Sequence, residues 1–155
     1  MSIAVIQTAF LGDALLSIPL LREIKRLCPE RSLIFVCRNG VGDLFRELDL
    51  VDQVLEVDKK SRKSREKVKK ELRQSDVDLL FCPHESFRST LLVSQLPIQQ
   101  KVGFRHWWNF WAFTDRIPRP MDLPDALRQL SLLQVVSEKF KSKFLSEASR
   151  LQNPL

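Results

Sequence analysis

Asp13 is the side chain of this sequence best placed to do chemistry, because it lies in a turn between a strand and a helix. The apolar run Ile3 to Ile6 predicts a buried strand, and the segment Ala14 to Leu27 predicts a helix. Ligands commonly bind in such turns, since the end of the sheet, the free N–H groups of the helix and the positive end of its dipole converge there. A carboxylate held ionised at that point can accept a proton from a neutral group such as a hydroxyl.

The composition of this turn excludes a dinucleotide site. Such a site needs several glycines so that the backbone can approach a pyrophosphate, whereas this turn contains only Gly12, and Asp13 follows it directly. We therefore predict a cleft with Asp13 at its mouth, lined by Thr8, Gly12 and, from the end of a later strand, His84. The alternative for Asp13 is a helix N-cap, which would contribute about 1 kcal/mol to helix stability. The alternative for His84 is a hydrogen-bonded polar residue at a strand end.

A strongly basic segment is the second notable feature. Between Lys59 and Arg73 there are nine basic and two acidic residues, a net charge of +7, whereas the whole chain has a net charge of +6. The segment follows the predicted strand Gln53 to Val57, so it leaves the sheet at the same carboxyl edge as the Asp13 turn. A cationic loop beside a carboxylate suits a substrate whose phosphates or carboxylates are held while a hydroxyl is presented. For Arg65 to Arg73 we favour the alternative, a solvated helix face.

Apolar and amphipathic segments alternate along the chain. Strands are predicted at 2–6, 33–37, 53–57, 77–81 and 100–104, and helices at 14–27, 42–48, 65–74, 87–96 and 124 to about 140. This alternation is typical of an α/β fold with a parallel, doubly wound sheet of about five or more strands. The strands are apolar throughout, which indicates that helices cover both faces of the sheet. Pro19 should bend the first helix, since a proline inside a helix removes a hydrogen bond.

The segment Phe104 to Phe113 concentrates six aromatic residues within ten positions, including all three tryptophans of the chain. Not all of these rings can point inward from one short segment, so we expect part of the cluster at Trp107 to Trp111 to be exposed. Exposed rings beside Arg105 and His106 could stack on bases, insert at a membrane interface or cover another domain. Packing in the core is the alternative.

The cysteines, the histidines and the apolar N-terminus bear on cellular location and on metal binding. Cys28, Cys37 and Cys82 are odd in number and contain no Cys-x-x-Cys pair, which predicts free thiols in the reducing cytoplasm. The two histidines, His84 and His106, lack carboxylate or cysteine partners at ligand spacing, so no metal site is predicted. The apolar N-terminus has no basic region, unlike an export signal, and no run of about 18 apolar residues predicts a membrane span.

Several of these motifs together resemble family 9 glycosyltransferases, the heptosyltransferases of lipopolysaccharide core assembly. The similarity starts with Gln7 to Asp13, continues through Ser17 to Leu21 and Leu27 to Glu30, and returns at Asp78 to Ser89 and Gln100 to Phe104. These segments span most of residues 1 to about 137. The Gly-Asp turn with its downstream proline is the most specific of them.

The resemblance implies a Rossmann-like fold that corresponds to the N-terminal half of a two-domain enzyme of the GT-B type. In this family the acceptor binds the N-terminal domain and the nucleotide sugar binds the C-terminal domain. Residues 1–140 would then form the acceptor-binding domain and residues 141–155 a C-terminal tail, with the nucleotide-sugar domain absent. Such a chain is expected to bind acceptor and to be inactive alone, with a separately encoded C-terminal half as a partner.

The resemblance also assigns roles to residues and partners. Asp13 would be the catalytic base, and acceptor-binding roles fall to Lys59, Arg62 and Lys63, with Arg88 and Arg119 as further candidates. The acceptor would be a lipopolysaccharide core glycolipid. The donor would be a nucleotide sugar of the ADP-heptose type, bound only with a C-terminal domain and used without a metal or cofactor. The expected location is the cytoplasm, with a peripheral contact to the inner face of the inner membrane, and nucleic acid is not an expected partner.

Two other classes of function stay open. The first is a non-catalytic module that binds polyanions, including nucleic acid, through residues 59–73. The second is a truncated remnant that folds but has no task.

Overall fold

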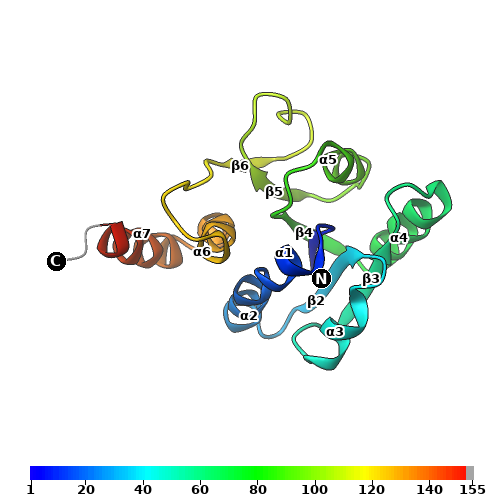
Figure 1. Cartoon of the computed structure of the whole chain (residues 1–155), viewed down its shortest axis with the longest axis horizontal. Coiled ribbons are helices and arrows are strands. Elements are labelled where there is room, and N and C mark those ends of the chain that lie inside the picture. Colours follow the sequence, from blue (N-terminus) through cyan, green and yellow to red (C-terminus); the bar gives the residue numbers. More distant parts are fainter. Residues whose placement is uncertain (153–155) are drawn as a thin grey trace.

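The computed structural model describes residues 1–152, which form one sheet flanked by helices (Figure 1). The strands are β1 (Ser2–Gln7), β2 (Ser32–Arg38), β3 (Gln53–Val57), β4 (Val77–Cys82), β5 (Gln100–Phe104) and β6 (Asp115–Ile117). The helices are α1 (Leu11–Leu15), α2 (Ile18–Leu27), α3 (Gly42–Glu47), α4 (Arg62–Gln74), α5 (Phe87–Ser94), α6 (Asp125–Leu130) and α7 (Glu138–Gln152), with a 3-10 helix, η1 (Ser131–Val135). The strands are parallel and lie in the order β3-β2-β1-β4-β5-β6. The predicted α/β fold with a parallel, doubly wound sheet is confirmed.

Both faces of the sheet are covered, which explains the unbroken apolar runs of the strands. On one face, Ile3 and Val5 of β1 belong to a buried cluster with side chains of α1, α2, α3 and η1. On the other face, Ala4 and Ile6 pack in a second cluster with side chains of α4 and α5. Figure 1 shows α2 and α3 on one side of the sheet and α4 and α5 on the opposite side.

The centre of the sheet is a topological switch point. β1 pairs with β2 on one side and with β4 on the other, so the chain leaves β1 and β4 in opposite directions. Loops that diverge in this way open a crevice at the carboxyl ends of the two strands, which is where open α/β sheets bind ligands. The turn that contains Asp13 follows β1, and the loop that contains His84 follows β4. The fold therefore places both predicted site residues at this crevice.

The predicted first helix, 14–27, is divided into α1 and α2. The division falls at Leu16 and Ser17, and Pro19 is the second residue of α2. A proline in the first turn sacrifices no hydrogen bond of its own N–H, because that N–H would have no helical partner. The proline therefore begins a new helix instead of bending a continuous one.

The C-terminal region differs more from the prediction. The segment expected as one helix, from 124 to about 140, is divided between α6, η1 and the start of α7. Residues 141–152 of the predicted tail are helical, and residues 153–155 lie outside the described part of the chain. The short strand β6 was not among the predicted strands, because three residues followed by Pro118 carry too little periodicity to be recognised.

Candidate functional site

Asp13 lies on the surface at the carboxyl edge of the sheet and is not a helix cap. Phe10 occupies the N-cap position of α1, with extended backbone angles and no capping side chain, and Asp13 is the third residue of the helix. The N-cap interpretation of Asp13 is therefore wrong. Within residues 1–150, no hydrogen bond or ion pair engages the Asp13 carboxylate, whose side chain is exposed. An ionised group without an internal partner is free to act on a ligand.

His84 lies near Asp13 of α1 and near Lys59 of the loop after β3. His84 follows β4 and is partly buried, and burial lowers the pKa of its imidazole below the usual value of 6.5. The positive charge of Lys59 lowers this pKa further, whereas the negative charges of Asp13 and Glu85 oppose the shift. Lys59, Asp13 and Glu85 are thus each close enough to influence His84. The imidazole is neutral at pH 7, and none of the hydrogen bonds found in the described residues satisfies its side chain, which argues against a purely structural role.

A cationic cleft adjoins this cluster. It has a volume of about 380 Å³ and is lined by Arg38 at the end of β2, Lys59 after β3 and Arg88 at the start of α5, together with Asn39, Val57, Asp58 and Lys60. Burial lowers the pKa of Lys59, and the positive charges of Arg38 and Arg88 lower it further. The guanidinium of Arg38 also lies 4.4 Å from the centre of the Phe10 ring, which connects the cleft to the turn that carries Asp13. An anionic group bound here would relieve the repulsion among the three cations.

Arg62 and Lys63 point in different directions although they are neighbours. Helix α4 starts at Arg62, because the Ser61 hydroxyl caps it by accepting a hydrogen bond of 3.2 Å from the Ser64 N–H. Arg62 lines a groove between α4 and α5 together with Lys59 and Arg88. Lys63 lines a separate groove on the other side of α4. The structure therefore groups Arg62 with the cationic cleft and does not group Lys63 with it.

Arg119 is held by carboxylates of the chain itself. Its guanidinium lies 3.1 Å from an oxygen of Glu85 and 2.9 Å from an oxygen of Asp125. The same Glu85 oxygen lies 2.9 Å from Nε2 of His106. Glu85, next to His84, thus joins the loops that follow β4, β5 and β6. Glu85 was not among the predicted site residues, although its position directly after a strand end could have identified it.

Thr8 and Gly12 have unlike environments. Thr8 is only 1% exposed, and its hydroxyl shares a hydrogen bond of 2.8 Å with the hydroxyl of Ser89 in α5. Thr8 therefore fixes β1 to α5 and does not line an open surface, contrary to our prediction. Gly12 is exposed, and a Cβ added to it would meet no atom within 4 Å. Because folding does not require a glycine at this position, the open space beside its backbone is available to a ligand.

The aromatic cluster is partly exposed, as predicted. Phe104 and Phe113 are buried, whereas Trp107, Phe110 and Trp111 have exposed fractions of 88%, 66% and 43%. Trp108 stacks on His106, with ring centres 5.4 Å apart. The cluster thus begins next to the Glu85 network and projects away from it.

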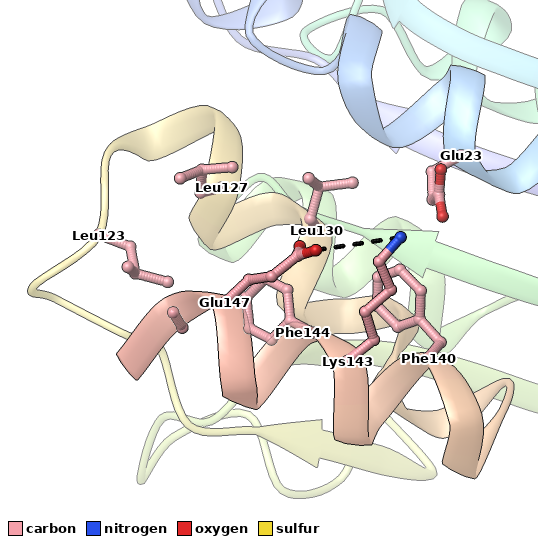
Figure 2. A pocket seen from close by; sticks show the side chains of 9 residues that line it. Glu23, Leu123, Leu127, Leu130, Phe140, Lys143, Phe144 and Glu147 are labelled. Atoms are coloured by element: carbon pink, nitrogen blue, oxygen red, sulfur yellow. Dashed lines mark ion pairs between the residues drawn. The ribbon is translucent and has the colours of Figure 1, made fainter. Parts of the chain in front are cut away.

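An apolar cavity of about 190 Å³ lies elsewhere, between α2, α6 and α7 (Figure 2). Leu127, Leu130, Phe140 and Phe144 line it, and the ion pair between Lys143 and Glu147, 3.9 Å, stands at its rim opposite Glu23. None of the site residues predicted from the sequence lines this cavity. It is therefore separate from the crevice.

The cysteines, the potential metal ligands and the lengths of the helices were also predicted from the sequence. Cys28, Cys37 and Cys82 are free thiols, and burial raises the pKa of Cys37 and of Cys82 to about 12, so that neither is a nucleophile at neutral pH. The described residues contain no group of three or more potential metal-binding side chains. They also contain no helix with the length and apolar character needed to cross a membrane.

No protein-family model matches the sequence, and no curated protein matches it significantly. Solved structures do match the fold. The structure of E. coli heptosyltransferase WaaC with ADP is 17% identical, with a TM-score of 0.74 over 87% of this chain and 47% of that protein. A family 9 glycosyl transferase from Veillonella parvula is 19% identical, with a TM-score of 0.76 over 86% of this chain and 40% of that protein. E. coli ADP-heptose LPS heptosyltransferase II is 21% identical, with a TM-score of 0.72 over 85% and 40%.

These similarities concern the fold, and the chain spans less than half the length of each of these three proteins. The resemblance seen in the sequence is thus matched in three dimensions: the parallel sheet and its helices have the architecture found in part of each of these glycosyltransferases.

Proposed function

We propose that this chain is the acceptor-binding domain of a glycosyltransferase of the heptosyltransferase type. With a nucleotide-sugar domain, it transfers a sugar from a nucleotide-activated donor to a lipopolysaccharide core acceptor. The observation that carries this proposal is the exposed, unpaired Asp13 carboxylate beside a cationic cleft, at the switch point of a fold that heptosyltransferases share. The structures similar to this chain include E. coli heptosyltransferase WaaC with ADP and with ADP-2-deoxy-2-fluoro heptose, which supports a donor of that kind.

In the proposed reaction, an acceptor hydroxyl attacks the anomeric carbon of the donor as the bond to the nucleoside diphosphate breaks. The hydroxyl oxygen becomes positively charged while the new bond forms, so its proton becomes acidic late in the reaction and passes to Asp13. A weakly basic carboxylate suffices for such a late transfer. His84, neutral at pH 7, lies beside Asp13 and can hydrogen-bond the same acceptor. The leaving diphosphate would be neutralised by the second domain.

The acceptor would be held through its anionic groups. Lys59, Arg62 and Arg88 line one continuous basic surface, and Arg38 extends it toward the Asp13 turn. Phosphates and acidic sugars of a lipopolysaccharide core match this surface in charge. Lys63 faces a different groove and Arg119 is already paired with Glu85 and Asp125, so we assign neither of them a direct contact with the acceptor.

Acceptor binding can be tested with the chain alone. Titration calorimetry with a deacylated, phosphorylated core oligosaccharide should give saturable binding. The double substitution Lys59→Ala with Arg88→Ala should weaken it about tenfold or more, since two charge-assisted contacts are lost. The matched control, Lys63→Ala with Lys67→Ala, removes the same charge from the other groove of α4 and should change the affinity little. Equal losses in both variants would contradict the assignment.

Catalysis would require a nucleotide-sugar domain together with this chain. Adding the separately produced nucleotide-sugar domain of a family 9 enzyme, or such a domain encoded apart from this chain, should restore sugar transfer from ADP-heptose to the core acceptor. If the chain binds the acceptor but no sugar is transferred under these conditions, the chain is a binding protein and the enzymatic part of the proposal is contradicted.

A non-catalytic polyanion-binding module is the second candidate, and the groove between α4 and α5 favours it, because six basic side chains and one carboxylate line that groove. This candidate predicts binding of single-stranded oligonucleotides that weakens steeply with salt and does not depend on Asp13. The same titrations therefore distinguish the two functions.

A further inference from the structure

Helix α5 separates two unlike surfaces. On one side lies the groove shared with α4, which we call the basic groove and which contains Lys59, Arg62, Arg65, Lys69, Arg73 and Arg88. On the other side lies the aromatic patch, formed by Phe87 of α5 and by Trp107, Trp108, Phe110 and Trp111 of the loop after β5. The ring of Phe87 lies 6.2 Å from Trp108 and 6.4 Å from Trp111, so the patch reaches α5 directly. The two surfaces are therefore neighbours.

The basic groove has a large excess of positive charge. Glu66 is its one carboxylate, and it forms an ion pair with Lys69, the buried lysine at the base of the groove. Lys69 also donates a hydrogen bond of 2.8 Å to the side-chain oxygen of Gln95. The one carboxylate of the groove is thus paired with Lys69, whereas Arg62, Arg73 and Arg88 are exposed and have no carboxylate partner among the described residues. A surface of this kind attracts a partner with many negative charges.

The aromatic patch is held in its exposed position by the loop itself. Asn109 is buried at 2% exposure, between Trp107 and Phe110 in the sequence. Its side-chain NH₂ donates to the carbonyl of Phe104 at 2.8 Å, and its side-chain oxygen accepts from the His106 N–H at 3.0 Å. Ala112 and Phe113 anchor the far end of the loop in the core. The hydrogen bonds of Asn109 and the buried end of the loop therefore fix a conformation in which the rings of Trp107 and Phe110 are exposed.

We propose that the basic groove and the aromatic patch together dock this chain on an anionic bilayer surface. The exposed rings would enter the interface between headgroups and acyl chains, where tryptophan is favoured. Arg65 and Arg73, the arginines of the groove that are not assigned to the acceptor, would lie over headgroup phosphates. Leu91, an exposed aliphatic residue of α5, lines the groove between the two sets of side chains. Aliphatic surface is stabilised by lipid and contributes nothing to base stacking, and one face of the Trp108 ring is already occupied by His106. These features favour a membrane over a nucleic acid.

The tryptophans make this inference directly testable, because all three lie in the docking loop. Vesicles of phosphatidylcholine with an equal part of phosphatidylglycerol should bind the full chain roughly tenfold or more tightly than pure phosphatidylcholine vesicles, and less tightly at high salt. On these anionic vesicles, tryptophan emission should shift to shorter wavelength and be quenched by brominated acyl chains. Inorganic polyphosphate, which can occupy the groove without immersing the rings, should leave the emission wavelength unchanged.

Two variants and their controls separate the contributions. Trp107→Ser with Phe110→Ser should weaken vesicle binding about tenfold or more, whereas Leu145→Ser removes an exposed apolar side chain of α7 and should not. Arg73→Glu should reduce the preference for anionic vesicles about tenfold, whereas Lys139→Glu should not, because α7 lies at the opposite end of the molecule from α4 (Figure 1). Circular dichroism verifies that each variant is folded.

Three results would overturn the proposal. The first is the absence of any preference of the wild-type chain for anionic vesicles. The second is vesicle binding that the aromatic double variant does not weaken, which would indicate simple adsorption of a basic protein. The third is tight binding of single-stranded RNA with tryptophan quenching but no binding of vesicles, which would assign the surface to nucleic acid. Sugar transfer does not enter any of these measurements, so the proposed function and the docking surface can fail independently.

Discussion

The pairing of charged residues differs between the two edges of the sheet. At the amino edge, charges are paired: Arg31 forms an ion pair with Asp78 and donates to the carbonyl of Ser2 at 3.2 Å. Asp52 forms an ion pair with Lys25 and accepts a hydrogen bond of 2.7 Å from the Leu33 N–H. At the carboxyl edge, Glu85 pairs with Arg119, but the carboxylate of Asp13 and the cations of the cationic cleft lie without such partners in the described chain.

The difference separates residues that stabilise the fold from residues that remain available to a ligand. Burial alone would raise the pKa of Asp52, but the hydrogen bonds from Lys25 and the Leu33 N–H outweigh it, and the pKa is lowered. At the carboxyl edge, burial and the positive charges of two neighbouring arginines lower the pKa of Lys59, so the charged form of this lysine is disfavoured. An arrangement that opposes its own charge gains free energy when an anion binds, which is the signature of a binding surface.

The largest expected effect is the loss of sugar transfer in Asp13→Asn. In the reconstituted enzyme, the rate should fall roughly 100-fold or more, since amide cannot accept the proton of the acceptor hydroxyl. The free energy of unfolding should stay the same, because Asp13 has no partner to lose among the residues that the structure describes. Single-turnover kinetics and urea denaturation measure the two quantities. An unchanged rate, or a large loss of stability, would show that Asp13 belongs with the structural charges of the amino edge.

The converse change at the amino edge is Asp52→Ala. It deprives the buried Leu33 N–H of its acceptor and leaves Lys25 without its ion pair, which should lower the free energy of unfolding by about 1–3 kcal/mol. Affinity for the core oligosaccharide should not change. Glu30→Ala is the matched control, because it removes one negative charge from an exposed position nearby, and it should be close to neutral in urea denaturation. A loss of acceptor affinity in Asp52→Ala would show that a charged residue of the amino edge also contributes to binding, and would contradict the distinction between the two edges.

Much of the carboxyl edge could be predicted from the sequence. The apolar strands and their alternation with helices gave the fold and the edge at which Asp13, His84 and Lys59 meet. The division between α1 and α2 could not be recognised, because a proline inside a helix and a proline that begins one have the same sequence neighbours. The network of Glu85, His106 and Arg119 was equally hidden, since it joins three loops far apart in the chain. Arg62 and Lys63 differ by one helical position, about 100°, and only the packed α5 shows which of them enters the basic groove.

His84 offers a test that depends on pH. Its pKa lies below 6.5 in the folded chain, so between that lowered value and 6.5 the unfolded chain binds more protons than the folded chain. Stability should therefore decrease as the pH falls below 6.5, and His84→Gln should remove part of this decrease. Urea denaturation of both proteins at about pH 7.5 and about pH 5.5 measures this decrease. Identical pH dependence of the two proteins would mean that the His84 imidazole is not held in the way described.

The smallest effects should come from a matched pair of lysines, Lys59→Met and Lys25→Met. Both substitutions keep most of the apolar stem and remove the charge. Lys25→Met loses an ion pair with Asp52 and should lower the free energy of unfolding by about 0.2–1 kcal/mol, the usual range for a pair open to solvent. Lys59→Met should leave stability unchanged or raise it, because burial, Arg38 and Arg88 all disfavour the ammonium. The pKa of Lys59 lies below 10.5 in the folded chain, so wild-type stability should gain as the pH rises toward 10.5, and Lys59→Met should lack this gain. A destabilised Lys59→Met would mean that the cationic cleft is built to hold the fold together, and the contrast between the two edges would disappear.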